Sequence, residues 1–335
     1  MSLTLRDARY ADVRLIFEEG PHKYNDTLGN DYISTTTFLH DLSTPFDKKY
    51  WLRKKSQELH ISEKRLAEQW DTITKEACER GTKTHNGLED GINLASKFKN
   101  AIKYMTNTDG TMITVADLPN INMNVKPLDI KEFIDATENK YPDVYKIFSF
   151  YTERDYKIYA EIGVFNLDVL ISGMIDVLCI RDDKFIIGDW KTNRGGLKFE
   201  AGYYKKDKTT RPAQTTNVWV PTPNRTLQAP LTHLQDCNGT IYNLQLSNYA
   251  FQTECILGIP CAGMWLCHID SDFVLNDYGM PKRFPDGLYH VKKHPKEKVT
   301  LHKMNYLKKE IMTLYNDRLR VIRANQVSNQ PTLFD

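Results

Sequence analysis

The sequence predicts an α/β protein in which a mixed central β-sheet is flanked by helices. Apolar residues recur at helical spacing from Pro45 to Gly81, which predicts a helical early part. From Lys157 to Trp190 the pattern changes to three short runs rich in β-branched and aromatic residues, which are typical of strands. A further helix and strand follow, so helices alternate again with the sheet. The length of 335 residues fits one large domain with insertions.

Residues 1–150 are expected to form a mainly helical N-terminal part packed on the core. Val13–Phe17 and Tyr32–Ile33 flank a turn-rich stretch from Asn25 to Asp31 and predict a hairpin. Gly81 is interpreted as the boundary between two helices. Residues 106–140 are polar and loop-like. The helices expected here cover 35–42, 45–81, 82–104 and, as a short element, 130–139.

Residues 151–325 are expected to form the core, interrupted by a polar insertion at 195–235, and residues 326–335 a flexible tail. The three β-rich runs are separated by turn residues and predict an antiparallel meander. Gly258 is expected to end the helix that follows the insertion. The elements expected are strands 157–165, 169–180, 184–190, 261–269 and 288–291, helix 241–257 and an amphipathic helix 301–323 with a basic face.

Composition excludes several classes of protein. With 41% hydrophobic and 26% charged residues the chain is not globally disordered, and a net charge of +2 means that any site for a polyanion must be a local groove. The six cysteines form no C-x-x-C pair, which argues against a zinc ribbon and a disulfide framework. The late trio Cys255, Cys261 and Cys267 has no partner before Cys78, which disfavours an iron–sulfur cluster. Met1–Tyr10 has no apolar core, and no run of 18 apolar residues occurs, so we expect a cytoplasmic protein.

The strongest chemical signal lies on two successive predicted strands. One ends Gly173-Met174-Ile175-Asp176 and the next ends Gly188-Asp189-Trp190-Lys191. Side chains at positions i and i+2 share a face, so Asp189 and Lys191 point the same way while Trp190 faces the opposite layer. Pairing across the turn would bring Asp176 near Asp189. Carboxylate oxygens placed in this way suit Mg²⁺ or Mn²⁺, which offsets their mutual repulsion.

These residues belong to five ordered motifs that resemble the PD-(D/E)xK nuclease superfamily. The resemblance is to its RecB-like exonuclease branch, which includes phage recombination and mitochondrial genome-maintenance exonucleases. It departs from the superfamily pattern at Ile175, where a proline is nominal, and in the long insertion before Gln245. In chain order the motifs are Gly81-x-x-x-His85 with Glu89 one turn later, Glu161, Gly173-x-x-Asp176, Asp189-x-Lys191 extended by Thr192, and Gln245-x-x-x-Tyr249.

The resemblance implies a restriction-endonuclease-like fold and a metal-dependent active site. It implies catalytic roles for Asp176, Asp189, Lys191 and Glu161, with Lys191 orienting a water molecule or stabilising the transition state. One or two Mg²⁺ or Mn²⁺ ions would be bound by a set that comprises His85, Asp176, Asp189 and the carbonyl of Trp190.

Each of these residues also has a purely structural interpretation. Asp176 is also compatible with a strand residue satisfied by a backbone amide, and Lys191 with an edge-strand residue that discourages aggregation. A single helical histidine such as His85 is most often a core or surface residue. Glu161 is equally compatible with a solvent-facing position on its strand.

A second group of residues is assigned to DNA binding. Gln245 and Tyr249 share a helix face and suit contact with the DNA backbone and support of the metal site, or a polar stripe beside the core. Thr192 is assigned with them. Arg80 suits phosphate, and Ser34 and Thr36 begin a helix, where either phosphate binding or ordinary N-capping explains them.

The implied function is a divalent-metal-dependent DNA exonuclease that acts from a DNA end in phage or bacterial replication, recombination or repair. It would thread a single strand beneath the helical N-terminal half. The alternatives are an endonuclease, an inactive DNA-binding protein of the same fold, and a hydrolase of another phosphate ester. The insertion at 195–235 suits either a DNA-guiding loop or a partner surface.

The C-terminal residues Gln330, Leu333 and Phe334 resemble the Q-x-x-L-F peptide with which bacterial replication proteins bind a sliding clamp. The alternative is a frayed tail without a partner. Deletion of the tail, followed by measurement of clamp binding, distinguishes the two.

Overall fold

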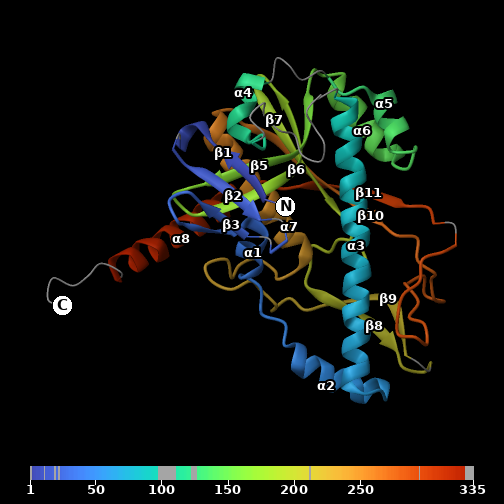
Figure 1. Cartoon of the computed structure of the whole chain (residues 1–335). Coiled ribbons are helices and arrows are strands. Elements are labelled where there is room, and N and C mark those ends of the chain that lie inside the picture. Colours follow the sequence, from blue (N-terminus) through green and yellow to red (C-terminus); the bar gives the residue numbers. More distant parts are fainter. Residues whose placement is uncertain are drawn as a thin grey trace.

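A large mixed β-sheet forms the centre of the protein in a computed structural model (Figure 1). The structure describes residues 2–10, 12–18, 20–21, 23–96, 111–121, 127–210, 213–293 and 295–328. Within these residues, nine strands form the sheet in the order β1-β2-β3-β4-β6-β7-β10-β11, with β5 paired to β6. The expectation of an α/β protein with a mixed central sheet is confirmed at this level.

The first four strands form an antiparallel meander that joins the rest of the sheet through β4. The expected hairpin partner of β2 was wrong, because β2 pairs with β3 and only β3 pairs with β4. Asn25, expected in a turn, lies in β3, since the Asp26 carboxylate closes the turn by accepting from the backbone of Leu28 and Asn30 at 2.9 Å each. The bounds are β1 Ser2–Arg6, β2 Arg14–Glu18, β3 Lys23–Asp26 and β4 Asp31–Ser34.

The predicted central meander is confirmed as β5 (Lys157–Asn166), β6 (Ile171–Arg181) and β7 (Lys184–Lys191). β10 (Cys261–Asp270) lies parallel to β7, and β11 (Lys298–Met304) pairs antiparallel with β10.

The expected helix over 301–323 begins too early, because residues 298–304 form β11. Tertiary pairing with β10 outweighs the helical spacing of apolar residues there. The last helix is therefore α8, Lys308–Ser328. Residues 288–291 were predicted as a strand, but they contribute only isolated bridges.

The prediction that Gly81 separates two helices was wrong. One long helix, α3 (Glu63–Ala95), runs through Gly81, and it begins after His60 in the left-handed conformation and Ser62 as N-cap. The helix α6 was not predicted. The remaining helices are α1 Thr35–His40, α2 Lys48–Leu59, α4 Leu118–Ile121, α5 Ile130–Ala136, α6 Pro142–Thr152 and α7 Asn238–Leu257.

Helices cover both faces of the sheet, which explains why its central strands are apolar on both sides. α7 packs on one face, over a core that includes Leu178, Ile187 and Leu266. α3, α5 and α6 pack on the other, over a core that includes Trp190 and Trp265. Each large side chain buried in this way stabilises the fold by roughly 1.5–3 kcal/mol relative to exposure.

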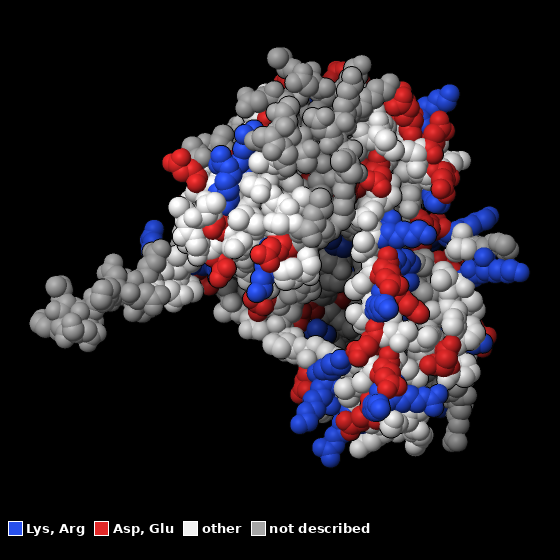
Figure 2. Space-filling model, viewed as in Figure 1, with Lys and Arg blue, Asp and Glu red and all other residues white. Residues whose placement is uncertain are grey.

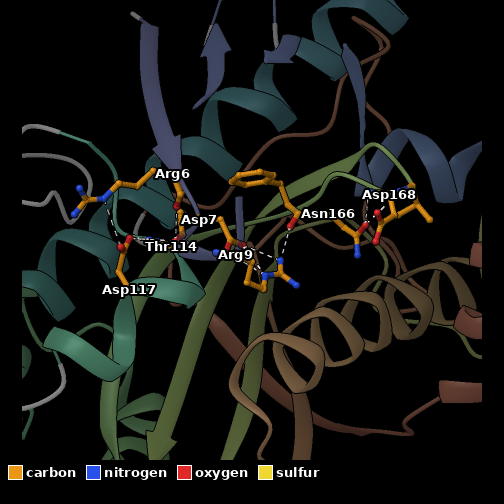
Figure 3. A network of polar contacts seen from close by, with 9 residues as sticks. Arg6, Asp7, Arg9, Thr114, Asp117, Asn166 and Asp168 are labelled. Atoms are coloured by element: carbon orange, nitrogen blue, oxygen red, sulfur yellow. Dashed lines mark hydrogen bonds and ion pairs between the residues drawn. The ribbon is translucent and has the colours of Figure 1, made fainter. Parts of the chain in front are cut away.

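A polar network fastens β1 to the end of β5 and to the segment 111–121 (Figure 3). The Arg9 guanidinium donates to the Asp7 carboxylate and, at 3.1 Å, to the Phe165 carbonyl. Thr114 donates to the Arg6 carbonyl at 2.8 Å and, through its backbone, to Asp117 at 2.9 Å. The early strands are thereby joined to the core, so residues 1–150 carry strands of the central sheet as well as helices.

The insertion at 195–235 contains a two-stranded hairpin, β8 (Gly202–Asp207) and β9 (Gln214–Pro221). A second excursion, residues 271–293, leaves β10 and is called the arm below. No helix in the described part of the chain combines the length and apolar character needed to cross a membrane. The clamp-binding residues Gln330, Leu333 and Phe334 lie outside the described residues.

Candidate active site

The two acidic strand residues meet where β6 and β7 separate. Pairing between these strands runs as far as Val177 and Gly188, and Asp176 and Asp189 are the next residues on each strand. Their carboxyl groups are hydrogen-bonded to each other, and the backbone N–H of Trp190 donates to Asp176 Oδ2 at 3.1 Å. The backbone amide expected for a purely structural Asp176 is thus present. It donates to only one oxygen of the carboxylate, however, and the same carboxylate also contacts Asp189.

Glu161 on β5 lies at the same level of the sheet. Its φ of 50° is left-handed and strained for a residue with a side chain, at a cost of order 1–3 kcal/mol. The strand changes face at this point, because Ala160 and Ile162 belong to the cores on opposite sides of the sheet. One ligand atom each from Glu161, His85 and Asp176 lies within 4.8 Å of the other two.

Helix α3 brings His85 to these carboxylates. Its Nδ1 lies 3.4 Å from Asp176 Oδ2, and the ring also donates to the Trp190 backbone carbonyl. Gly81, one turn earlier on the same helix face, permits the close approach, since a Cβ there would lie 3.0 Å from Thr192 Oγ1. The Gly-x-x-x-His spacing therefore places a small residue and His85 on one helix face against the end of β7.

This packing predicts that two glycines of α3 respond differently to alanine. A Cβ on Gly87 has no neighbour within 4 Å, so Gly87→Ala should raise the free energy of unfolding by about 1 kcal/mol through helix propensity. Gly81→Ala should not raise the free energy of unfolding, because the new Cβ forces the Thr192 side chain to move. Urea denaturation of both variants measures the difference; an equal gain at both positions would show that α3 does not approach β7 so closely.

Lys191 is paired with Asp189. Its Nζ lies 2.6 Å from Asp189 Oδ2 and donates to Oδ1 at 2.9 Å, and only 16% of its side chain is exposed. Tyr242, on α7, places its ring 4.9 Å from the same ammonium. The cation is therefore fixed, rather than extended into solvent as an edge-strand residue would be.

Burial dominates the protonation of the cluster. It raises the pKa of Asp189 to about 8, with repulsion from Asp176 adding and Lys191 opposing, and it also raises the pKa of Asp176. Burial lowers the pKa of His85 to about 4, assisted by Lys191. For Lys191, burial opposes the charged form, but Asp189 and Asp176 outweigh it and raise the pKa.

These residues fit a divalent cation. His85 is neutral at neutral pH, as a metal ligand must be, and the carboxylates are held together against their own repulsion. Asp189 Oδ2 is buried and accepts no hydrogen bond within the described residues, although Lys191 is in ion-pair contact with it. Asp176, Glu161 and His85 would supply one ligand atom each. Asp189, also expected as a ligand, is not part of this group and is paired with Lys191. The Trp190 carbonyl, also expected as a ligand, accepts a hydrogen bond from the His85 ring.

Gln245 and Tyr249 reach the acidic pair from α7 and are almost fully buried. Gln245 is hydrogen-bonded to Tyr249, whose pKa is raised by burial and by Asp176 and Asp189. A Cβ on Gly173 would lie 2.8 Å from the Tyr249 ring, so the glycine of the Gly-x-x-Asp motif makes room for this tyrosine. Burial favours support of the site over direct contact of Tyr249 with DNA.

A cleft of about 510 Å³ opens beside this cluster between α3, the end of β7, Tyr242 and the arm. Its lining includes four residues that the sequence analysis assigned to the site, namely Arg80, His85, Lys191 and Thr192. The face drawn in Figure 2 is hollowed next to α3, and blue Lys or Arg atoms lie inside the hollow and along its lower rim.

Ser34 and Thr36 do not line this cleft. Ser34 is buried and accepts from the Thr37 backbone at 3.1 Å, so N-capping of α1 accounts for it. Thr36 is exposed on the same short helix. The structure thus favours the capping explanation that the sequence left open.

Among the cleft-lining residues that sequence reasoning missed, four carry an aromatic ring or a guanidinium group. Tyr242 lies one helical turn before Gln245 and was detectable from that spacing. Arg194 follows Lys191 by three residues, while Phe273 and Tyr289 come from the arm, which carries no periodic pattern.

The cysteines lie apart from the cleft, except Cys78 on α3. Cys261 and Cys267 are on β10 and Cys255 is on α7; burial raises the pKa of the Cys261 thiol to about 11 and of the Cys267 thiol to about 12. All six are free thiols.

Comparison of the chain with known protein families, curated proteins and solved structures finds no match to any of them. The assignment of function therefore depends on the motifs and on the geometry of the cluster.

Proposed function

We propose that the protein is a divalent-metal-dependent nuclease of the PD-(D/E)xK type that hydrolyses phosphodiester bonds in DNA. The observation that carries this proposal is the cluster itself: a histidine and two carboxylates, from α3, β5 and β6, lie close enough together to share a cation, beside the ion pair of Asp189 and Lys191. The histidine and the lysine also line the cleft. Packing alone does not explain this grouping, because each buried charge costs free energy unless something compensates it.

Lys191 supplies the fixed positive charge that stabilises the transition state. Asp189 and Tyr242 hold its ammonium in the cleft, where it stabilises the negative charge that develops on the phosphoryl oxygens. A divalent cation bound by the carboxylates and His85 would neutralise the phosphate and acidify the attacking water. The water oxygen forms a new bond to phosphorus while the P–O bond to the leaving oxygen breaks; the proton of the water passes to a carboxylate, and the leaving oxygen is protonated from solvent.

Action from a DNA end is the form of the activity that we favour. Residues of helix α3 and the arm line the cleft, so a single strand that enters from its end is accommodated more readily than an internal segment of a duplex. Recombination, repair and replication are the processes in which such an activity would serve.

The experiment that tests this function is incubation of the purified protein with end-labelled single- and double-stranded DNA in Mg²⁺, Mn²⁺ or EDTA. We expect cleavage with either metal and none with EDTA. A linear single strand should be degraded faster than the same strand as a closed circle. Binding without cleavage would favour the inactive DNA-binding alternative, and equal rates on both topologies would favour an endonuclease.

A further inference from the structure

The arm is hydrogen-bonded to two other parts of the protein, one at each end of the segment 276–286. On one side Asn276 donates to the Thr215 carbonyl at 2.8 Å and Tyr278 donates to the Asp207 carboxylate at 2.5 Å, which ties the arm to the β8–β9 hairpin. On the other, Gln69 of α3 accepts from Arg283 at 2.8 Å and donates to the Asp286 carbonyl at 2.9 Å. Hydrogen bonds therefore join the arm both to the β8–β9 hairpin of the insertion and to α3.

Two arginines stack on aromatic rings of this arm. The Arg80 guanidinium of α3 lies 5.3 Å from the Phe273 ring, and the Arg194 guanidinium lies 3.6 Å from the Tyr289 ring. All four residues line the cleft that also contains Lys191. The loop that carries Arg194 is itself fixed, because buried His268 is hydrogen-bonded to the Asn193 carbonyl at 2.7 Å.

The charge of these arginines is incompletely compensated. Neither forms an ion pair in the described part of the chain, and the buried Nε of Arg80 has no hydrogen-bond partner there. Burial lowers the pKa of Arg194, and Arg80 and Arg283 lower it further, while Asp270 opposes them. Like charges gathered in this way are stabilised by an anion.

We propose that Arg80 and Arg194 bind the phosphates that flank the scissile one, so that the ligand of this cleft is a single strand of DNA several nucleotides long. The inference rests on the proposed function only in placing the scissile phosphate at the metal cluster. Arg194 follows Lys191 by three positions, so their Cα atoms lie at most about 11 Å apart, which keeps both cations on one short stretch of strand.

The shape of the cleft selects a single strand. A volume of about 510 Å³ is that of a small-molecule site and takes one or two nucleotides, not a duplex. Guanidinium groups read phosphates through forked hydrogen bonds, and the arm's rings add faces on which bases stack. The site is therefore insensitive to base sequence.

The test is binding of a fluorescent 20-nucleotide oligothymidylate in EDTA, measured by anisotropy against salt concentration. Arg80→Gln and Arg194→Gln should each raise Kd about tenfold and reduce the slope of log K against log salt by about 0.7. The control is Arg154→Gln, since Arg154 stacks on Phe150 at 3.7 Å but lies outside the cleft, and it should leave Kd and slope unchanged.

Equal effects of all three substitutions, or no effect of Arg80→Gln and Arg194→Gln, would overturn the inference. Stabilisation of each variant by Mn²⁺ in a thermal-shift assay should match the original protein, which separates loss of phosphate binding from damage to the cluster. If wild-type protein cuts no DNA yet binds it through both arginines, the nuclease proposal fails while this one stands. If the protein cuts DNA but binds it equally well without the arginines, the nuclease proposal stands and this inference fails.

Discussion

Replacing Lys191 by alanine is expected to lower the rate of Mg²⁺-dependent DNA cleavage about 10²–10³-fold without weakening binding of the metal. The loss is that of a fixed, largely buried charge that would stabilise the negative charge developing on the phosphoryl oxygens. Metal affinity should not fall, because Lys191 is a cation beside the ion and repels it.

Single-turnover cleavage of a labelled strand measures the rate, and a Mn²⁺ titration followed by thermal shift measures affinity. Lys184→Ala is the matched control, since Lys184 lies on the same strand beside Asp183 at the far turn and should cut normally. Normal cleavage by Lys191→Ala would remove this residue from the reaction.

Replacing Asp189 by asparagine should change how stability depends on pH in the metal-free protein. The pKa of Asp189 is raised by burial and by Asp176 to about 8, against an ordinary value of 3.8. Between these values the folded state holds a proton that the unfolded state has lost. The contribution of Asp189 to the free energy of unfolding is therefore present at low pH and is lost as pH rises towards 8. His85, with its pKa lowered to about 4, has the opposite effect, but only below about pH 6.5.

The informative window is therefore pH 6.5 to 8. There the free energy of unfolding of the EDTA-treated protein should fall with pH by a kcal/mol or more, and Asp189→Asn should flatten the slope. Asp183→Asn is the control, because the Arg181 side chain lowers the pKa of Asp183 to about 2 and its contribution is lost only in acid. A slope unchanged in Asp189→Asn would mean that this carboxyl is ionised throughout.

The elements whose signal lies in neighbouring residues were predicted correctly from the sequence. Short polar turns separate the three apolar runs that form β5, β6 and β7, and the shared face of Asp189 and Lys191 follows from strand geometry alone. Gly81 was misread because its sequence context does not reveal that it permits contact between α3 and Thr192. β11 was missed because only its pairing with β10 makes it a strand.

The motif residues of the candidate site could be predicted from the sequence, but the other residues that line the cleft could not. His85 and Glu161 came from the motif order, and no local pattern joins either of them to Asp176. The arm's aromatic residues depend on contacts of the arm with α3 and the β8–β9 hairpin, more than 60 residues away in sequence, and Arg194 depends on its contact with Tyr289 of the arm. Ser34 satisfied a phosphate pattern and a capping pattern equally, and only the Thr37 hydrogen bond distinguishes them.

The most direct measurement is pulsed electron paramagnetic resonance of Mn²⁺ added to the EDTA-treated protein at pH 8. We expect bound Mn²⁺ with a hyperfine coupling to an imidazole nitrogen, a coupling that disappears in His85→Gln, and greatly weakened binding in Asp176→Asn. Mn²⁺ that binds without nitrogen coupling, or a coupling that persists in His85→Gln, would contradict a metal site built from these residues.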